Sequence, residues 1–273
     1  MPARSLAVHR HPSACPKGLP PLLFVHGAYT NARCWQLHFI PFLNERGFDC
    51  YALDLSGHGE SGGHAQIDAF GLDDYAADVA EAVDGLPALP VLVGHSMGTQ
   101  VVERYLIGGG RAAGVVLMAP VPPSGTGGSA SRLALTRPDF FAELPNAVSG
   151  RPTEATFRVM TEVYFSPAMP HREMAEFLPM MERESDRAVA EMAALPFLRT
   201  GRRPSLPALV MGGGADAVFP PSMLFFTTLA WRAQSVTVPG CGHMLMLDRP
   251  WPAAAEALAG WLETRFQARS SIA

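Results

Sequence analysis

Short, continuous apolar segments alternate with segments of helical periodicity along this 273-residue chain. An apolar run that does not alternate with polar residues is typical of a strand buried on both faces, and strands separated by helices form parallel sheets. The pattern therefore predicts an α/β fold in which helices cover both faces of a mostly parallel central sheet. The predicted strands are residues 22–25, 49–55, 91–93, 115–119, 208–211 and 235–238, and the predicted helices are residues 31–46, 73–84, 97–107, 221–233 and 252–267.

The pattern changes after the fourth predicted strand, where a loop of small residues (SGTGGSAS, 124–131) leads into helical periodicity. Residues 124–204 are therefore predicted to form a helical cap, inserted into a core domain made of residues 1–123 and 205–273. Arginines and acidic residues are equally frequent in this segment, so it has no net charge to attract an ionic ligand. Its apolar side chains favour a neutral one. They include Phe140, Phe141, Phe157, Phe165 and Phe177.

Composition excludes several classes of function. A chain with 48% apolar residues, 17% charged residues and a net charge of −4 is typical of a globular protein, and without a basic run it has no nucleic-acid partner. No apolar run approaches the roughly 18 residues that span a bilayer, so stable membrane insertion is not expected. Residues 1–21 lack the apolar stretch of a signal peptide, and the four cysteines have no metal-site spacing. We expect a cytoplasmic monomer or homodimer without a metal.

The sequence Gly94-His95-Ser96-Met97-Gly98 has the form G-x-S-x-G and lies between a predicted strand and a predicted helix. In this context the motif forms a sharp turn that exposes the serine hydroxyl, and the glycines are needed because side chains there would collide with neighbouring backbone. Ser96 is therefore the predicted nucleophile.

A serine nucleophile needs a base, and the base needs a group that orients it. Among nine histidines, His243 is the best placed, because it lies in a glycine-rich loop after the last predicted strand. His9 and His11 precede the predicted fold, and His26 and His58 lie in turns suited to structural hydrogen bonds. His243 is therefore the predicted base.

Asp216 is the predicted orienting acid. It follows the strand at 208–211 and precedes His243 by 27 residues, which gives the chain order Ser, Asp, His. The loop after the strand at 115–119 offers no carboxylate, and Asp248 lies too few residues beyond His243 to turn back to it.

Two backbone amides are predicted to stabilise an oxyanion. The amide of Met97 begins the helix after the nucleophile, where N–H groups are unpaired. The amide of Ala28 follows His26-Gly27 after the first predicted strand.

The chain resembles the α/β-hydrolase superfamily over most of its length outside 124–204. The segments that carry the resemblance are HGAYTNARCW, YALDLSGHGES, GHSMG, GGADAVFP and GCGHM. The HGA segment followed by Trp35 is similar to the plant methyl-esterase and hydroxynitrile-lyase branch. The lyases carry Thr at the position of Gly27 and Lys at the position of Met244, so these departures favour ester hydrolysis. Haloalkane dehalogenases and epoxide hydrolases are also similar, but their nucleophile is Asp, and Ser96 argues against both.

The sequence Gly57-His58-Gly59-Glu60-Ser61-Gly62 also matches the dinucleotide-binding pattern G-x-G-x-x-G. No convincing helix starts after it, so no helix N-terminus would receive a pyrophosphate. We expect a loop near the rim of the pocket instead.

The leading hypothesis is a carboxylic-ester hydrolase without a cofactor, acting on neutral, short- to medium-chain esters through an acyl-enzyme. The same triad could instead hydrolyse C–C bonds or thioesters, or perform cofactor-free perhydrolysis. A hypothesis of another class is a ligand receptor on the same fold with slow turnover.

Overall fold

A seven-stranded sheet forms the centre of the computed structural model, which describes residues 5–167, 169–170, 173–193 and 203–266. Its strand order is β1-β3-β2-β4-β5-β6-β7, with β1 antiparallel to β3 and every other pair parallel. This confirms the predicted α/β fold. The strands are β1 (Ala7–His11), β2 (Leu22–Val25), β3 (Cys50–Asp54), β4 (Val91–His95), β5 (Gly114–Met118), β6 (Ala208–Gly213) and β7 (Gln234–Val238).

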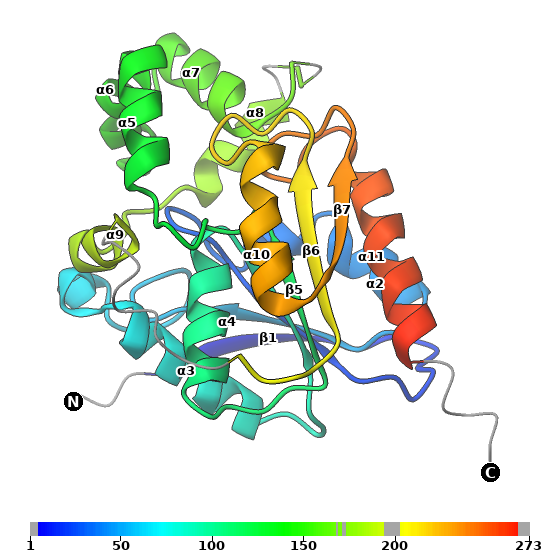
Figure 1. The fold of residues 1–273 in the computed structure, drawn as a ribbon. Helices are drawn as coiled ribbons and strands as arrows, with labels where there is room; N and C mark the ends of the chain where they lie inside the picture. Colours follow the sequence, from blue (N-terminus) through cyan, green and yellow to red (C-terminus); the bar gives the residue numbers. More distant parts are fainter. Residues whose placement is uncertain (1–4, 168, 171–172, 194–202, 267–273) are drawn as a thin grey trace.

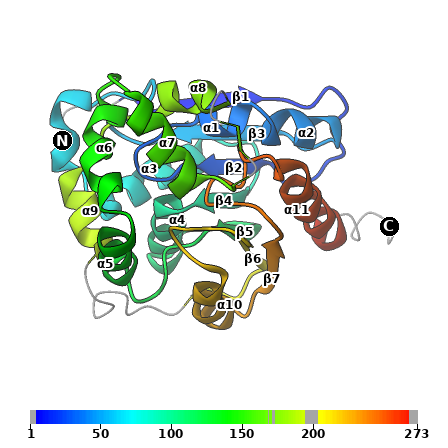
Figure 2. The same cartoon turned by 90° about the horizontal axis from the view of Figure 1, so that it is seen from above.

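Each face of the sheet has its own apolar core, because successive strand residues point to opposite faces. Leu22 and Phe24 of β2 pack with α1, α2 and α11, whereas Leu23 and Val25 pack with α3, α4 and α10. Figure 2 shows these two layers from above. The helices of the core are α1 (Arg33–Gln36), α2 (Phe39–Glu45), α3 (Leu72–Asp84), α4 (Met97–Ile107), α10 (Leu224–Trp231) and α11 (Trp251–Phe266), with 3₁₀ turns η1 (His64–Ala69) and η5 (Pro221–Met223).

The helix predicted at 31–46 is two short helices, and the predicted helix at 221–233 is a 3₁₀ turn followed by α10. The first break lies at His38, whose backbone leaves the helical region. Trp35 before this break and Phe39 after it are both fully buried, with ring centroids 6.0 Å apart.

The prediction that His9 and His11 precede the fold is wrong, because both belong to β1. Its residues are half-buried, with polar and apolar side chains mixed, so it lacks the apolar run that marks the inner strands. The strand is held by its antiparallel register with β3 and by His9, whose Nε2 lies 2.8 Å from Oδ2 of Asp54. Such a partly polar edge strand is difficult to recognise from sequence.

Among the residues described between β5 and β6, in the segment predicted to be a cap, there are five α-helices. Figure 1 shows α5 to α8 above the carboxyl ends of the strands. Within the described residues, no helix has the length and apolar character that a membrane crossing requires. The helices are α5 (Gly127–Thr136), α6 (Pro138–Val148), α7 (Glu154–Tyr164), α8 (Met174–Phe177), followed by the 3₁₀ turn η3 (Leu178–Met180), and α9 (Asp186–Ala193).

The glycine-rich loop after β3 anchors this helical segment to the core. His58 and Glu184 form an ion pair of 3.2 Å in which both side chains are fully buried. The hydroxyl of Tyr75 also donates to Glu184 (2.9 Å), and the Gly59 amide donates to Glu182 (2.8 Å). The loop was expected near the pocket rim, but its residues are not among those that line the cavity at Ser96. They position the segment that covers that cavity.

Burial lowers the pKa of His58, but the Glu184 carboxylate outweighs this effect and the net shift is upward from 6.5. Burial raises the pKa of Glu184, and His58 reverses the shift to below 4.5. The contribution of His58 to stability is therefore present below pH 6.5 and lost as the pH rises through its raised pKa. The contribution of Glu184 is present above pH 4.5 and lost as the pH falls.

We expect Glu184→Gln to lower the free energy of unfolding at pH 6 by about 3 kcal/mol, because it leaves a buried His58 without its counter-ion. The deficit should shrink towards pH 9, where the ion pair no longer stabilises the parent protein. Urea unfolding at pH 6 and pH 9 measures both values. Glu60→Gln, an exposed change in the same loop, is the control. An equal deficit at both pH values would contradict the pairing.

Candidate active site

Ser96 occupies a strained turn between β4 and α4. Its backbone has φ 48° and ψ −117°, a conformation that costs free energy in a residue other than glycine. The Ser96 amide donates to the carbonyl of Met118 on β5 (3.0 Å), which ties the turn to the sheet. This geometry lifts the side chain above the carboxyl end of β4, as the sequence predicts for this motif.

The two flanking glycines permit this turn. A Cβ atom on Gly98 would lie 2.5 Å from the carbonyl oxygens of both Val25 and His26, and one on Gly94 would lie 2.6 Å from the Gly98 oxygen. All of these neighbours are backbone atoms, which cannot rotate away. The turn therefore requires glycine at both positions.

His243 lies in the loop after β7 and is only 2% exposed. Its carbonyl lies 3.0 Å from Nε2 of His95, and the amide of the next residue, Met244, donates to the carbonyl of Tyr164 (3.0 Å). Burial and the neighbouring His243 lower the pKa of His95 well below 6.5, so a neutral ring makes this contact. His95 thus positions the loop that carries His243.

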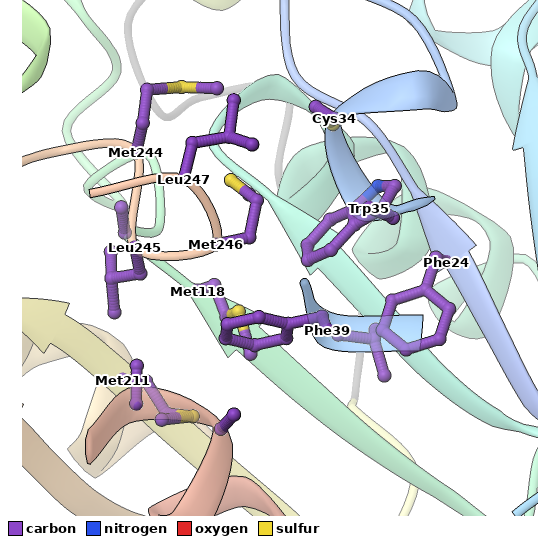
Figure 3. Close-up of a cluster of buried hydrophobic side chains, with 14 of the residues drawn as sticks. Phe24, Cys34, Trp35, Phe39, Met118, Met211, Met244, Leu245, Met246 and Leu247 are labelled. Carbon is purple, nitrogen blue, oxygen red and sulfur yellow. The ribbon is translucent and has the colours of Figure 1, made fainter. Parts of the chain in front are cut away.

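The residues after His243 insert into the core. Figure 3 shows Met244 to Leu247 beside Met118 of β5 and Met211 of β6, on the side of the sheet that carries Trp35. Leu245 and Met246 are fully buried, and burial of each such side chain contributes about 1.5–3 kcal/mol. Apolar packing therefore fixes the loop immediately beyond His243.

The structure brings Asp216 and His243 together. Nδ1 of His243 lies 2.9 Å from Oδ2 of Asp216, and both residues are buried. The other carboxylate oxygen accepts hydrogen bonds from the amides of Val218 (2.7 Å) and Phe219 (2.8 Å). These amides fix the carboxylate, and the carboxylate fixes the imidazole, so that Nε2 is free to face the cavity.

The carboxylate of Asp248, the alternative acid, forms hydrogen bonds with other groups. It accepts hydrogen bonds from the amides of Ser166 (2.8 Å), Gly242 (2.6 Å) and Arg249 (2.8 Å), and from the Ser166 hydroxyl (2.9 Å). Its carboxylate therefore organises the loop around Gly242 and does not contact the His243 ring.

Ser96 and His243 line the same cavity, but within the described part of the chain no hydrogen bond joins the serine hydroxyl to the imidazole. Such a nucleophile–base contact is often looser before substrate binds. The structure thus assembles the acid–base half of the predicted triad and places the serine beside it.

The predicted oxyanion donors flank Ser96. Met97 is the first residue of α4, so its amide belongs to the unpaired helix N-terminus. Ala28 lines the cavity with Ser96, and a Cβ on the preceding Gly27 would lie 3.1 Å from the Ser96 Cβ. Nδ1 of the buried His26 lies 2.8 Å from the Gly27 carbonyl, and its Nε2 accepts from the Leu55 amide (3.1 Å). His26 therefore ties the start of the Ala28 loop to the end of β3.

The cavity above Ser96 has a volume of about 140 Å³. Among the described residues that line it, none is Asp, Glu, Lys or Arg. Of the five phenylalanines noted in the sequence, Phe140, Phe141 and Phe177 line it, whereas Phe157 and Phe165 pack elsewhere. Sequence reasoning missed Tyr29, Tyr164 and Phe219, which lie in different segments and share no motif. The described residues contain no group of three His, Cys, Asp or Glu side chains suited to a metal ion.

Comparisons with known proteins agree with this architecture. The model of a family described as "Alpha/beta hydrolase family" matches residues 22–257. The non-heme chloroperoxidase of Burkholderia pyrrocinia is 36% identical over 114 residues, which is 40% of this chain and 40% of that protein. The dihydrolipoyllysine-residue acetyltransferase component of the acetoin cleaving system of Pseudomonas putida is 28% identical over 242 residues, 85% of this chain and 60% of that protein. These alignments span less than two thirds of either relative.

Two solved structures align with this chain over nearly the whole length of both chains. An esterase from Exiguobacterium antarcticum is 20% identical, with a TM-score of 0.76, over 95% of this chain and 96% of the other. A putative non-heme bromoperoxidase from Mycobacterium tuberculosis H37Rv is 20% identical, with a TM-score of 0.75, over 96% of each chain. At this identity the likeness establishes the shared fold.

We expect Gly98→Ala to destabilise the protein by about 2 kcal/mol, because the new methyl group would overlap the backbone carbonyls of Val25, at the end of β2, and of His26. Gly128→Ala is the control, since a Cβ there meets no atom within 4 Å and alanine favours a helix. Urea unfolding of both variants measures the difference. Equal stability of the two variants would argue against the close contact at Gly98.

Proposed function

The chain belongs to the alpha/beta hydrolase family, and on that premise we propose that it is a serine hydrolase that cleaves carboxylic esters through an acyl-enzyme. The observation that carries the proposal is the 2.9 Å contact between Asp216 and His243 beside a serine on a strained turn. A carboxylate that fixes an imidazole next to an exposed hydroxyl is the arrangement that activates a serine nucleophile.

In the proposed mechanism His243 Nε2 takes the proton of the Ser96 hydroxyl as the serine oxygen attacks the ester carbonyl. Asp216 stabilises the resulting imidazolium through Nδ1 and remains ionised. The tetrahedral intermediate collapses when His243 returns the proton to the leaving alcohol. Water, activated by the same imidazole, then releases the acid and restores Ser96.

The amides of Ala28 and Met97 stabilise the oxyanion in this proposal. A negative charge develops on the carbonyl oxygen during attack, and preorganised N–H groups stabilise it more strongly in a site that excludes water. Support comes from the contact of the Ala28 loop with the turn at Ser96 and from the position of Met97 at the start of α4.

We also propose that residues 124–204 act as a cap domain on a core formed by residues 1–123 and 205–273. Leu133, Phe140 and Met192 line the cavity from this segment, opposite Ser96. A volume of about 140 Å³ is close to that of a cavity that holds benzene. The cap therefore favours a neutral ester of short to medium chain, for which apolar burial contributes about 25 cal/mol per Å².

Cofactor-free perhydrolysis is a second candidate function, favoured by relatives named as haloperoxidases. Hydrogen peroxide would replace water in the second half-reaction: its oxygen attacks the acyl carbonyl, the bond to Ser96 breaks, and His243 returns the proton to the serine. The products are a peracid and free enzyme. Peracid formed from acetate and hydrogen peroxide, and lost in Ser96→Ala, would support this activity.

We expect Ser96→Ala to lower kcat on p-nitrophenyl butyrate by about 10⁴- to 10⁶-fold, because the members of a triad act as one unit. Asp216→Asn should cost about 10⁴-fold, since an amide donates to Nδ1 and imposes the wrong tautomer. Steady-state kinetics measure both effects. The same measurements with EDTA test whether turnover requires a metal ion. Ser205→Ala and Asp84→Asn, both on exposed residues, are the matched controls. Near wild-type turnover in either active-site variant would reject the proposed triad.

We expect kcat/KM to be highest for p-nitrophenyl butyrate, to remain measurable for the octanoate and to fall for the palmitate, because a cavity of about 140 Å³ cannot hold the longest chain. A succinate ester should be a poor substrate, because the described lining offers no cation. Initial rates measured with each of the four esters test this order of preference. Preference for the palmitate or the succinate would be incompatible with this pocket.

A further inference from the structure

Tyr164, the last residue of α7, has a polar group in an otherwise apolar part of the cavity wall. Its side chain is 91% buried, being 9% exposed. Its ring centroid lies 5.7 Å from that of Phe140, 5.9 Å from that of Phe177 and 6.0 Å from that of His243, and all four residues line the cavity. The phenol therefore stands next to the predicted base.

The Tyr164 hydroxyl has no hydrogen-bond partner among the residues that the structure describes, and it is not one of the polar atoms that are fully shielded from solvent. The hydroxyl is therefore accessible to water in the free protein, and a ligand that displaces this water without supplying an acceptor leaves the hydroxyl unpaired. Burial, and then the nearby Tyr29, raise the pKa of Tyr164, so the hydroxyl is a donor at neutral pH. It is therefore available to a ligand in the cavity.

Tyr29 offers a second such hydroxyl. It lines the same cavity, and its backbone has φ 63°, a left-handed conformation that is strained for a bulky residue. Its hydroxyl has no partner within the described ranges either. Burial, with Glu184 and Asp186, raises the pKa of Tyr29 to about 12. By contrast, the hydroxyls of Tyr75 and Tyr105 bond within the protein.

Backbone contacts hold both tyrosines in place. The Tyr164 carbonyl accepts from the Met244 amide (3.0 Å), which ties α7 to the loop of His243. The Tyr29 carbonyl accepts from the Glu182 amide (3.0 Å), which ties the loop of Ala28 to the helical segment above it. Rigid donors in the wall of the cavity discriminate between substrates, because a misplaced or missing acceptor leaves them unpaired.

We propose that Tyr164, together with Tyr29, forms a subsite for an uncharged acceptor oxygen, so that the preferred ester carries an ether or carbonyl oxygen besides its scissile group. This inference rests on the proposed ester hydrolysis. An anionic group is disfavoured because the carboxylates of Glu184 and Asp186 act on Tyr29, and no described lining residue is cationic.

Matched esters that differ only by an oxygen in place of a methylene test the subsite. Ethyl 4-methoxybutanoate with ethyl hexanoate examines the acyl side, and 2-methoxyethyl butanoate with butyl butanoate examines the alcohol side. Alkyl esters followed by pH-stat titration avoid the nitro group of the usual chromogenic esters, which is itself an acceptor. The readout is the ratio of kcat/KM for the ether to that for its hydrocarbon partner.

Tyr164→Phe should lower this ratio about tenfold in one of the two pairs, as expected for the loss of one buried hydrogen bond, and the pair that responds identifies the side of the substrate. Tyr29→Phe should lower it in the same pair. Tyr51→Phe is the matched control, because this buried tyrosine on β3 lies outside the cavity. Ratios that stay within twofold in both pairs, or that change equally in the control, would overturn the subsite.

Binding to Ser96→Ala protein, measured by calorimetry, separates the subsite from turnover. The added Tyr164→Phe change should weaken binding of the responding ether about tenfold relative to its hydrocarbon partner, and an unchanged relative affinity overturns the subsite. If the wild-type enzyme hydrolyses none of the four esters, the proposed function fails, and the binding ratio alone decides the subsite. Circular dichroism of each variant establishes that it is folded.

Discussion

The close approach of the turn at Ser96 to strand β2 is the constraint on which the rest of the site depends. The α-carbon of Gly98 lies so near the carbonyls of Val25 and His26 that a methyl group there would overlap both. Because β2 and β4 are neighbours in the sheet, this contact brings the end of β2, and with it the loop of Ala28, against the nucleophile. The strained backbone of Ser96 and the free N-terminus of α4 follow from the same turn.

The opposite side of the site is built from loops that the core holds rigid. His243 gains its position from the apolar side chains that follow it, from His95 beneath it and from the Asp216 carboxylate. Asp248 arranges the neighbouring backbone without contacting the imidazole. Asp216 and Asp248 therefore have different tasks, which are set by the groups from which each carboxylate accepts hydrogen bonds.

The segment above the cavity is attached to the core by buried polar groups. Glu182 and Glu184 contact the loop after β3, and Glu182 also accepts from Asn31 and donates its amide to Tyr29. The same few residues thus hold the roof in place and support the loop that carries Ala28. The backbone hydrogen bond from the Glu182 amide to the Tyr29 carbonyl joins this segment directly to that loop.

The inner strands and the turn at Ser96 were predictable from sequence, because a doubly buried strand needs a continuous apolar run and the turn needs glycines at fixed spacing. The edge strand β1 escaped prediction because a half-exposed strand carries no such signal. The sequence by itself determined the α/β fold, the place of the serine turn and the order in which Ser96, Asp216 and His243 follow. Only the tertiary structure decided how His58 pairs with Glu184 across more than a hundred residues, and how Tyr29 and Tyr164 come to face one cavity. These are contacts between distant segments, and no local pattern encodes them, since each depends on how the helices above the sheet pack.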